Sequence, residues 1–429
     1  MRVGETMLPS GAADEPRDGV VVPLPIREPA PEPESEAVRK RLALLETVSL
    51  FFTLPEPSLR KLARRLRPVK VRKDEVLIGL GEKCRRLYVI EDGFCELSSS
   101  GGPLLVVGER DVVGASSVLH DEPSPVVVRA LRDCRLLALE GADLLEVAPR
   151  NSELHQALKR VSSQRRVRLQ EMSRRVNPTS ASGPTVVSVY SPKGGSGKTT
   201  IAVSLATTLA HQERGGVLLF DLALPYNHAA LMTRLQPTCC LARLARLDGP
   251  AFEAALEGSV LFHPSGLMVL PTALLPEEAD LVTPDLVLRA LEALRRGFRY
   301  IVFDLGVGLS ETAVAALEQT DHLIAVTTPE LSSLNDLGRL YPMLERVFRL
   351  PLPRVHLVVN HRSPNSVVGE REVKSILRRE VAAEIRYDGL RPEEAAVRGQ
   401  LLVGDPRSAI ARGTSELARR IKKAEAASA

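Results

Sequence analysis

The residues with the clearest chemistry lie in one glycine-rich stretch, SPKGGSGKTT, at residues 191–200. Glycines let backbone N–H groups converge on phosphate oxygens, and the positive end of a following helix adds to the attraction. Lys198 can reach the β- and γ-phosphates of a nucleotide, and the Thr199 hydroxyl can ligate Mg²⁺. These residue types at this spacing predict a phosphate loop.

The segments on either side of the loop are those that such a loop requires. TVVSVYS, residues 185–191, has the composition of a buried strand, and IAVSLATTLAHQ, residues 201–212, that of a helix. A strand–loop–helix order brings the loop N–H groups and the helix N-terminus to one point. We therefore expect a nucleotide to bind here.

Strand-like and helical segments alternate from Thr185 onward. The strand-like runs are TVVSVYS, GVLLFDL, GLMVLP, YIVFDL, HLIAVTT and RVHLVVN. Continuous apolar runs of this kind are typical of parallel strands that helices cover on both faces. The second half of the chain is therefore predicted to be an α/β domain with a parallel sheet.

Lys193 stands ahead of the first glycine, and the form KGGSGKT resembles the deviant Walker A motif of the ParA/MinD superfamily of P-loop ATPases, of the SIMIBI type. LLFDLALPYNHAALM stands where that family has switch I, and YIVFDLGVGLSE where it has Walker B and switch II. The resemblance covers roughly residues 185–422. It implies a homodimer with ATP sandwiched between subunits, in which Lys193 contacts the phosphates of the partner's nucleotide.

The resemblance also assigns roles outside the loop. It implies that Asp304 holds Mg²⁺ through water, that the Gly308 N–H contacts the γ-phosphate, and that Asn360 reads the adenine edge. The expected cofactors are ATP and Mg²⁺, with Thr199 and Asp304 as the metal residues. The expected nucleotide-binding residues are Lys193, Gly194, Gly195, Ser196, Gly197, Lys198, Thr199, Thr200, Gly308 and Asn360.

One position departs from the family pattern. Switch I usually reads Asp-x-Asp, and its second carboxylate is credited with positioning the attacking water, but here the pair is Asp221 and Ala223. The expected catalytic residues are Lys193, Lys198 and Asp221. Because phosphoryl transfer depends on positioning and electrostatics, we predict tight ATP binding with slow hydrolysis. Compensation by Asp221 or Asn227 is left open by the sequence.

Residues 38–150 show short β-like runs separated by turn residues, which predicts a small sandwich or barrel. Three phrases in order resemble a cyclic-nucleotide-binding β-roll of the catabolite-activator type: LLETVSLFFTLPEPSLRKLARRL, KDEVLIGLGEKCRRLYVIEDGFCEL and VVGERDVVGASSVLHDEPSPVVVRAL. Gly81 and Gly93 fall where that fold needs tight turns. The resemblance implies the fold, whereas ligand binding depends on the residues of the site.

Those residues do not favour a cyclic nucleotide. The family's phosphate cassette has a glutamate after a glycine and an arginine about ten residues later. Here Ala115 follows Gly114, and Ser124 stands at the arginine position, with Arg129 expected on the next strand. Without the arginine, the charged cyclic phosphate loses its main hydrogen bonds. We therefore expect an interaction module that binds no cyclic nucleotide.

The remaining segments complete a predicted organisation of four parts. Residues 1–37 are rich in Pro and Glu and are expected to be disordered, and residues 151–184 form a helix and linker between residues 38–150 and the ATPase domain at 185–429. The apolar stripe of helix 151–176 either dimerises as a coiled coil or packs on its own domain. Its basic residues either contact nucleic acid or an acidic membrane, or form a solvated face.

Composition limits the class of protein. The chain of 429 residues has a net charge of +4, five cysteines without metal-site spacing, and no apolar run of the length a membrane span needs. A cytoplasmic protein with reduced thiols and no transmembrane segment is expected.

DHLIAVTTPELSSLNDLGRL and LLVGDPRSAIARGTSELARRI are similar to the CpaE/TadZ branch, which helps to place pilus machinery at bacterial cell poles. The resemblance implies an ATP-dependent dimerising switch that positions pilus or secretion machinery, at the pole or on the nucleoid. Two alternatives stay open: a nucleotide-bound scaffold that scarcely hydrolyses ATP, and a partitioning ATPase that binds nonspecific DNA. Whether the chain is a useful enzyme is not decided by its sequence.

Overall fold

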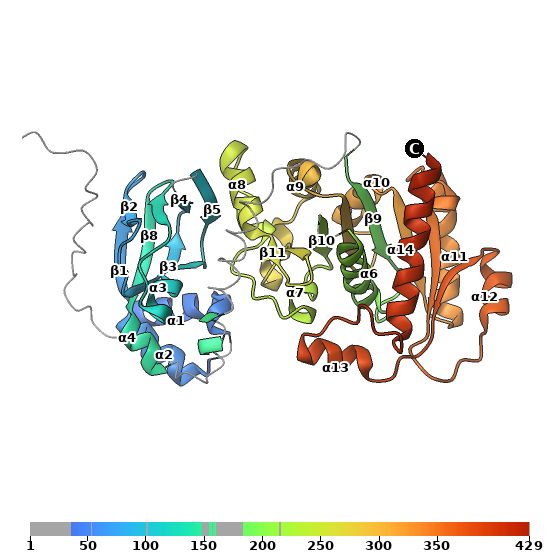
Figure 1. Cartoon of the computed structure of the whole chain (residues 1–429), viewed down its shortest axis with the longest axis horizontal. Coiled ribbons are helices and arrows are strands. Elements are labelled where there is room, and N and C mark those ends of the chain that lie inside the picture. Colours follow the sequence, from blue (N-terminus) through green and yellow to red (C-terminus); the bar gives the residue numbers. More distant parts are fainter. Residues whose placement is uncertain are drawn as a thin grey trace, which may run out of the picture.

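The computed structural model describes residues 36–52, 54–99, 102–147, 154–156, 158–159, 183–213 and 216–428. These residues form a β-rich domain followed by an α/β domain with a larger sheet (Figure 1). The predicted fold class is confirmed for both.

Two antiparallel four-stranded sheets form the β-rich domain, in the orders β1-β8-β3-β6 and β2-β7-β4-β5. Apolar side chains that alternate along these strands meet between the sheets and exclude water. The helices α1, α2 and α4 pack beside this roll over a second apolar cluster. The elements are α1 (Glu36–Thr47), η1 (Ser49–Phe51), α2 (Glu56–Arg65), β1 (Arg67–Val71), β2 (Val76–Ile78), β3 (Arg86–Asp92), β4 (Cys95–Ser99), β5 (Gly102–Val107), β6 (Val112–Val113), α3 (Ala115–His120), β7 (Val127–Ala130), β8 (Cys134–Glu140) and α4 (Gly141–Val147).

The turn between β3 and β4 requires glycine, as its sequence predicts. Gly93 has φ of 112°, and a Cβ there would lie 2.4 Å from the Cys134 Sγ. Both the left-handed backbone and the close approach exclude a side chain. The turn therefore joins β3 of one sheet to β4 of the other.

One eight-stranded sheet organises the α/β domain, in the order β11-β12-β10-β13-β9-β14-β15-β16. Its strands run parallel except β11, which pairs antiparallel with β12 at the edge. The elements are β9 (Thr185–Tyr190), α6 (Lys198–Gln212), β10 (Val217–Leu222), α7 (Ala229–Met232), η2 (Leu241–Leu244), α8 (Gly249–Ser259), β11 (Leu261–Phe262), β12 (Leu267–Pro271), η3 (Pro276–Leu281), α9 (Pro284–Leu294), η4 (Arg295–Gly297), β13 (Tyr300–Leu305), α10 (Glu311–Glu318), β14 (His322–Thr327), α11 (Leu331–Arg346), η5 (Leu352–Arg354), β15 (Val355–Asn360), α12 (Glu370–Leu377), β16 (Val381–Ile385), α13 (Arg391–Arg398) and α14 (Ala409–Ser428).

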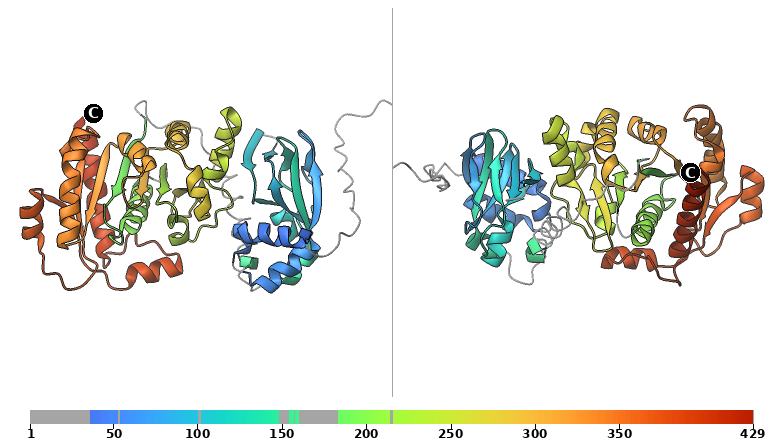
Figure 2. Two further views of the ribbon diagram at one scale, coloured as in Figure 1. Left: turned by 180° about the vertical axis from the view of Figure 1, so that it is seen from behind. Right: turned by 45° about the horizontal axis from the view of Figure 1, so that its top comes forward.

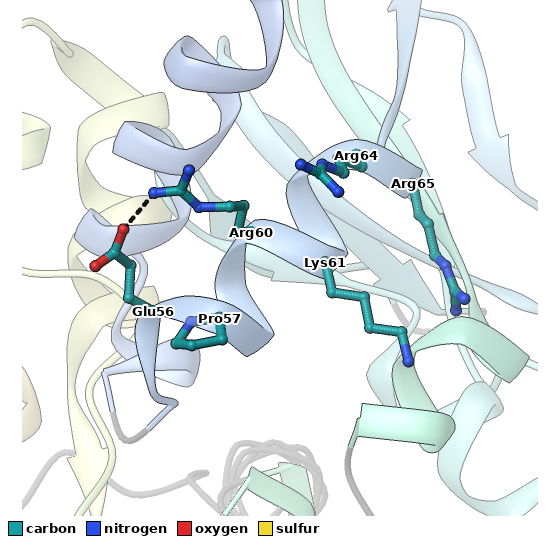
Figure 3. A pocket seen from close by; sticks show the side chains of 6 residues that line it. All are labelled: Glu56, Pro57, Arg60, Lys61, Arg64 and Arg65. Atoms are coloured by element: carbon teal, nitrogen blue, oxygen red, sulfur yellow. Dashed lines mark hydrogen bonds and ion pairs between the residues drawn. The ribbon is translucent and has the colours of Figure 1, made fainter. Parts of the chain in front are cut away.

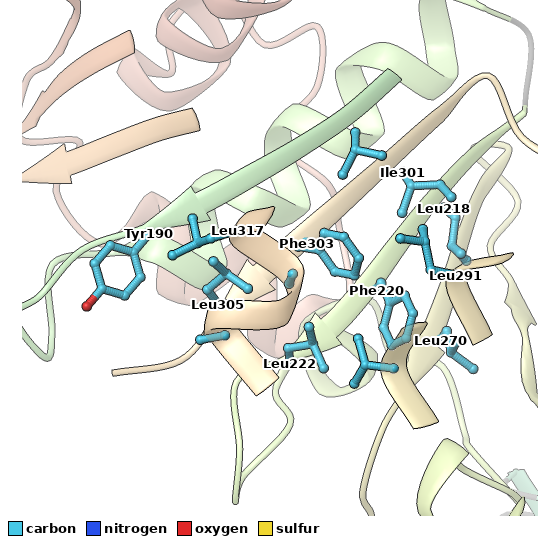
Figure 4. Close-up of a cluster of buried hydrophobic side chains, with 14 of the residues drawn as sticks. Tyr190, Leu218, Phe220, Leu222, Leu270, Leu291, Ile301, Phe303, Leu305 and Leu317 are labelled. Atoms are coloured by element: carbon cyan, nitrogen blue, oxygen red, sulfur yellow. The ribbon is translucent and has the colours of Figure 1, made fainter. Parts of the chain in front are cut away.

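Two apolar cores lie on opposite faces of this sheet. Helices α8 to α12 contribute to one core, where Phe220 and Phe303 meet with ring centroids 5.1 Å apart (Figure 4). Helices α6 and α14 contribute to the other and pack against each other. Because both faces are covered, every residue of β10, β13 and β14 is buried.

The strands that sequence analysis missed are short or lie at an edge. These are β1, β6, β11 and β16, whose mixed or brief apolar patterns give a weak signal. The helix α1 begins at Glu36, within the last two residues of the predicted tail, and residues 1–35 lie outside the described residues. Most of the predicted helix 151–176 also lies outside them, but Leu154 and Leu158 are buried in the β-rich domain. At those two positions the stripe packs on its own domain.

Across the described parts of the chain, no helix is both long enough and apolar enough to span a membrane.

Candidate nucleotide site

The predicted site residues converge on the edge of the sheet where the parallel strands end. The phosphate loop follows β9, which lies between β13 and β14 in the sheet. Asp221 near the end of β10 is directly paired with Asp304 of β13, and Asp304 is paired with Val189 of β9. In open α/β sheets this carboxyl edge is where ligands bind.

Backbone conformation sets the shape of the phosphate loop. Gly195 and Gly197 have φ of 70° and 90°, and Gly197 is the N-cap of α6. A Cβ on Gly197 would lie 2.3 Å from the Asn360 Nδ2. That amide group donates a hydrogen bond of 2.8 Å to the Ser196 carbonyl, so Asn360 braces the loop from the end of β15.

Lys198 curls back over the loop. Its Nζ donates a hydrogen bond of 3.1 Å to the Lys193 carbonyl, and the residue is only 7% exposed. Burial lowers the pKa of Lys198, and the nearby Asp304 opposes that effect. A phosphate group would supply the anionic partner that this buried ammonium group favours.

Asp304 has the properties of a carboxylate that binds a cation. It is fully buried, and neither of its oxygens has a hydrogen-bond partner among the described residues. Burial and then the charge of Asp221 raise its pKa to about 8, although the neighbouring Thr199 hydroxyl and Lys198 lower it. An unpaired buried carboxylate is costly, and a divalent cation removes that cost.

These donors fit Mg²⁺ in the manner of P-loop proteins. A hydroxyl and one carboxylate are hard oxygen ligands, and Mg²⁺ usually takes only one or two protein ligands beside water and substrate phosphates. The described residues contain no cluster of three or more His, Cys, Asp or Glu side chains that could hold a metal alone. Thr199 and Asp304 would therefore hold the ion together with nucleotide phosphates and water.

Asp221 is fully engaged in holding switch I. Its Oδ1 accepts hydrogen bonds from the Ala223 N–H at 3.1 Å and the Asn227 Nδ2 at 3.2 Å, and its Oδ2 accepts one from the Ala229 N–H at 2.9 Å. Burial raises the pKa of Asp221 to about 6, against the effect of these N–H donors. Its contacts are those of a carboxylate that positions backbone.

Both ends of the Asn227 side-chain amide also form hydrogen bonds within the protein. Its Oδ1 accepts from the backbone N–H groups of Thr272 at 2.9 Å and Ala273 at 2.7 Å, which follow β12. Its Nδ2 donates to both the carbonyl and the Oδ1 of Asp221, each at 3.2 Å. Neither side chain that could compensate for Ala223 is thus free to orient water in this conformation.

Lys193 contacts a carboxylate that sequence analysis did not identify. Its Nζ is paired with the Glu330 carboxylate and donates a hydrogen bond of 3.1 Å to the Ser332 Oγ. Glu330 is the N-cap of α11 and comes three residues after β14. The position of Glu330 just after a strand could have indicated this contact, because adjacent parallel strands end at one edge of the sheet.

The remaining predicted residues line the same edge. Gly194 and Gly195 are exposed, and Thr200 lies in the first turn of α6. Gly308 has φ of 81° in the loop between β13 and α10. Its neighbour Val307 approaches the loop, since a Cβ on Gly194 would lie 3.8 Å from the Val307 Cγ2.

The cassette of the β-rich domain offers no charge for a cyclic phosphate. Ala115 opens α3 and is 3% exposed, and a Cβ on Gly114 would lie 2.2 Å from the Arg86 carbonyl oxygen. The Ser124 hydroxyl is buried and donates to the Val126 carbonyl at 2.7 Å. Arg129 points outward, where its Nη1 donates to the Asp74 carbonyl at 2.7 Å.

A surface pocket of this domain lies on α2, far from the phosphate loop (Figures 1 and 3). Most of its basic side chains already have acidic partners. Arg60 pairs with Glu56 at 2.5 Å, and Lys61 and Arg65 pair with Glu146 at 2.5 and 2.6 Å. Its lining residues are Glu56, Pro57, Arg60, Lys61, Arg64 and Arg65. The carboxylates at this pocket make it a poor match for an anionic nucleotide.

Comparisons with known proteins match two separate parts of the chain. Residues 68–151 match the family model described as a cyclic nucleotide-binding domain, and residues 184–352 match the one described as an AAA domain. An ATP-binding protein of Methanocaldococcus jannaschii is 26% identical over 222 residues, which are 51% of this chain and 78% of that protein. The septum site-determining protein MinD of Escherichia coli K12 is 27% identical over 234 residues, covering 52% and 83%.

Among solved structures, MinD of Pyrococcus horikoshii complexed with Mg-ADP aligns with a TM-score of 0.50 at 23% identity. The alignment covers 57% of this chain and 99% of that one. The fold and the site define a P-loop nucleotide-binding protein. More particularly, the α/β domain has the parallel-sheet fold of MinD/ParA P-loop proteins, and it follows an N-terminal β-rich domain that matches the cyclic nucleotide-binding model.

Proposed function

We propose that this protein binds Mg-ATP and dimerises around it as a switch that positions a cellular assembly. The observation that carries the proposal is the buried, unpartnered Asp304 carboxylate beside Thr199 and Lys198. In that arrangement Mg²⁺ would relieve the buried negative charge, and the nucleotide's phosphates would meet Lys198 and the loop N–H groups. The archaeal ATP-binding relative supports nucleotide binding, and the similarity to the septum site-determining protein MinD supports the positioning role.

Each residue of the proposed site has a distinct task. The backbone from Gly194 to Thr200 surrounds the phosphates, Lys198 neutralises them, and Thr199 with Asp304 holds Mg²⁺. Gly308 contributes its N–H group to the γ-phosphate. Asn360 braces the loop, and the family resemblance assigns it to the adenine edge.

Lys193 is the residue through which ATP would control the dimer. A partly exposed lysine paired with Glu330 can exchange that carboxylate for the phosphates of a facing subunit, because both are anions. ATP would then favour the dimer, because Lys193 would contact the partner's phosphates in the dimer and not in the monomer.

The domains proposed are residues 38–150 and 185–429, joined by a helix and linker.

A second candidate function, a scaffold that holds ATP and scarcely hydrolyses it, is favoured by the contacts of switch I. Ala223 has no polar side chain, and Asp221 and Asn227 are both committed to backbone. Turnover measured with and without candidate partners separates the two functions. We propose slow turnover as the intrinsic property and pilus or secretion machinery as the cargo, in line with the CpaE/TadZ resemblance.

Light scattering on a size-exclusion column tests the switch directly. The wild-type chain should be monomeric without nucleotide and dimeric with Mg-ATP, while Lys193→Ala should bind ATP and stay monomeric. A wild type that binds ATP but remains monomeric would exclude the switch. Duplex DNA binding that weakens steeply with salt would instead favour the partitioning alternative.

A further inference from the structure

The β-rich domain and the ATPase domain share one apolar core. Strand β5 lies along α8 in both views of the molecule (Figures 1 and 2). Phe94 and Val106 of the β-rich domain are buried in the same cluster as Phe252 of α8. The N-terminal domain is therefore docked against the ATPase domain and contributes to its packing.

Glu278, a buried carboxylate of the ATPase domain, forms an ion pair with Arg110 of the β-rich domain. The Glu278 Oε1 accepts hydrogen bonds from the Arg243 Nε at 2.8 Å and from the Arg110 Nη1 at 2.9 Å. The side chains of Glu278 and Arg243 are 4% and 5% exposed, whereas Arg110 belongs to the β-rich domain. Burial would raise the pKa of Glu278, but Arg243 and the backbone donor of Leu274 outweigh it and hold the pKa below its usual value.

The other oxygen of Glu278 holds the loop that follows β12. Its Oε2 accepts from the backbone N–H groups of Leu274 at 2.8 Å and Leu275 at 3.2 Å. The two preceding residues donate their N–H groups to Asn227, which in turn donates to Asp221 of switch I. Hydrogen bonds on either side of the backbone segment 272–275 thus connect the β-rich domain with the edge of the nucleotide site.

Removal of one partner from a buried ion pair is strongly destabilising, because it leaves an uncompensated buried charge. Loss of Arg110 would remove one of the two guanidinium partners of the Glu278 Oε1 and would leave the carboxylate held from the ATPase domain only, by Arg243, the Cys240 thiol and the N–H groups of the loop. The loop carries both N–H groups that Asn227 needs. Asn227 and Glu278 are therefore positioning residues for switch I.

We propose that Arg110 couples the β-rich domain to switch I through Glu278 and Asn227, so that docking of this domain keeps the nucleotide site in its binding conformation. The coupling rests on the proposed ATP binding and adds a regulatory input to it. Anything that displaced the β-rich domain from α8 would loosen switch I and weaken ATP binding. Such linkage between two sites is reciprocal, so ATP would also stabilise the docked arrangement.

The test compares Arg110→Ala with Arg135→Ala in the full chain. Arg135 is 59% exposed and pairs with Glu91 and Asp92 inside its own domain. The Arg135→Ala variant therefore removes a surface arginine and leaves the Arg110–Glu278 contact unchanged. Arg110→Ala should weaken the affinity for a fluorescent ATP analogue by at least about threefold and speed amide hydrogen exchange in residues 221–229 and 272–278. Arg135→Ala should change neither.

A double-mutant cycle with Asn227→Ala separates coupling from general destabilisation. The effects of Arg110→Ala and Asn227→Ala on affinity should be non-additive, because the second variant breaks the route that the first uses. Additive effects, or an Arg110→Ala affinity within twofold of the wild type, would overturn the proposal. If the wild type itself bound no ATP, the proposed function would fail instead, and the exchange data would still report whether Arg110 holds switch I.

Discussion

Lys193, the residue expected to reach across a dimer, is paired in the single chain with the carboxylate of Glu330 at the start of α11. The ammonium group also contacts the Ser332 hydroxyl at 3.1 Å. A lysine held in this way must exchange one anion for another before it can contact a partner's phosphates. The pairing would therefore compete with the proposed dimerisation.

We expect Glu330→Gln to lower the ATP concentration at which half of the chain is dimeric. The pair is partly exposed, with side-chain accessibilities of 33% and 54%, so its contribution is about 0.2–1 kcal/mol and the shift a few-fold at most. Sedimentation of the wild type and the variant across an ATP series measures it. Glu345→Gln, at an exposed position on the same helix, is the control and should not move the midpoint. A higher midpoint for Glu330→Gln would show that this carboxylate assists the dimer.

Removal of the Asp304 carboxylate should separate metal binding from phosphate binding. We expect Asp304→Asn to weaken ATP affinity at least about tenfold in the presence of Mg²⁺, because the ion would lose the carboxylate proposed to hold it. In EDTA the affinities of the two proteins should converge, since the phosphate loop is unchanged. Titration calorimetry under both conditions measures these affinities. An equal loss of affinity in EDTA would show that Asp304 supports the structure of the site and does not act through Mg²⁺.

The sequence was sufficient for the phosphate loop because its residues are contiguous and its chemistry is local. Glycine positions, the strand before them and the helix after them follow from a few residues each. The contacts that restrain the site could not be found in this way. Lys193 and Glu330 are 137 residues apart, and Arg110 and Glu278 are 168 apart. Such pairs depend on strand order and domain docking, which single-sequence patterns do not specify.

The committed state of Asp221 and Asn227 illustrates the same limit. From the sequence, either side chain could have replaced the missing switch I carboxylate. Their roles were decided by the backbone groups that surround them, including N–H groups from residues 272 and 273. A polar residue near a site is a candidate for chemistry only after its hydrogen bonds have been counted.

The contribution of Asp304 to stability without nucleotide should fall as pH rises. The folded pKa of Asp304 is raised above its ordinary value of 3.8 to about 8, so the folded chain binds this proton more tightly than the unfolded chain. The contribution of Asp304 to the free energy of unfolding therefore decreases between about pH 4 and pH 8, by up to about 1.4 kcal/mol per pH unit. Asp221, raised to about 6, acts in the same direction.

Urea unfolding at pH 5 and pH 7.5 tests this dependence. Asp304→Asn should be more stable than the wild type at pH 7.5 and should show a smaller loss between the two values. Asp285→Asn removes a carboxylate that is 81% exposed and should keep the wild-type dependence. Equal slopes in wild type and Asp304→Asn would mean that Asp304 is ionised throughout and has found another partner.

The last prediction concerns turnover. Ala223→Asp should raise the steady-state ATPase rate at least about tenfold, because it restores a carboxylate to the switch I position that orients the attacking water. The backbone there is already held by the bond from the Ala223 N–H to Asp221, so the new side chain would start from a fixed Cα. Ala223→Asn has the same shape without the charge and should give much less. If neither variant changed the rate while ATP binding persisted, slow hydrolysis would have its cause elsewhere, and the committed hydrogen bonds of Asp221 and Asn227 would be the next to vary.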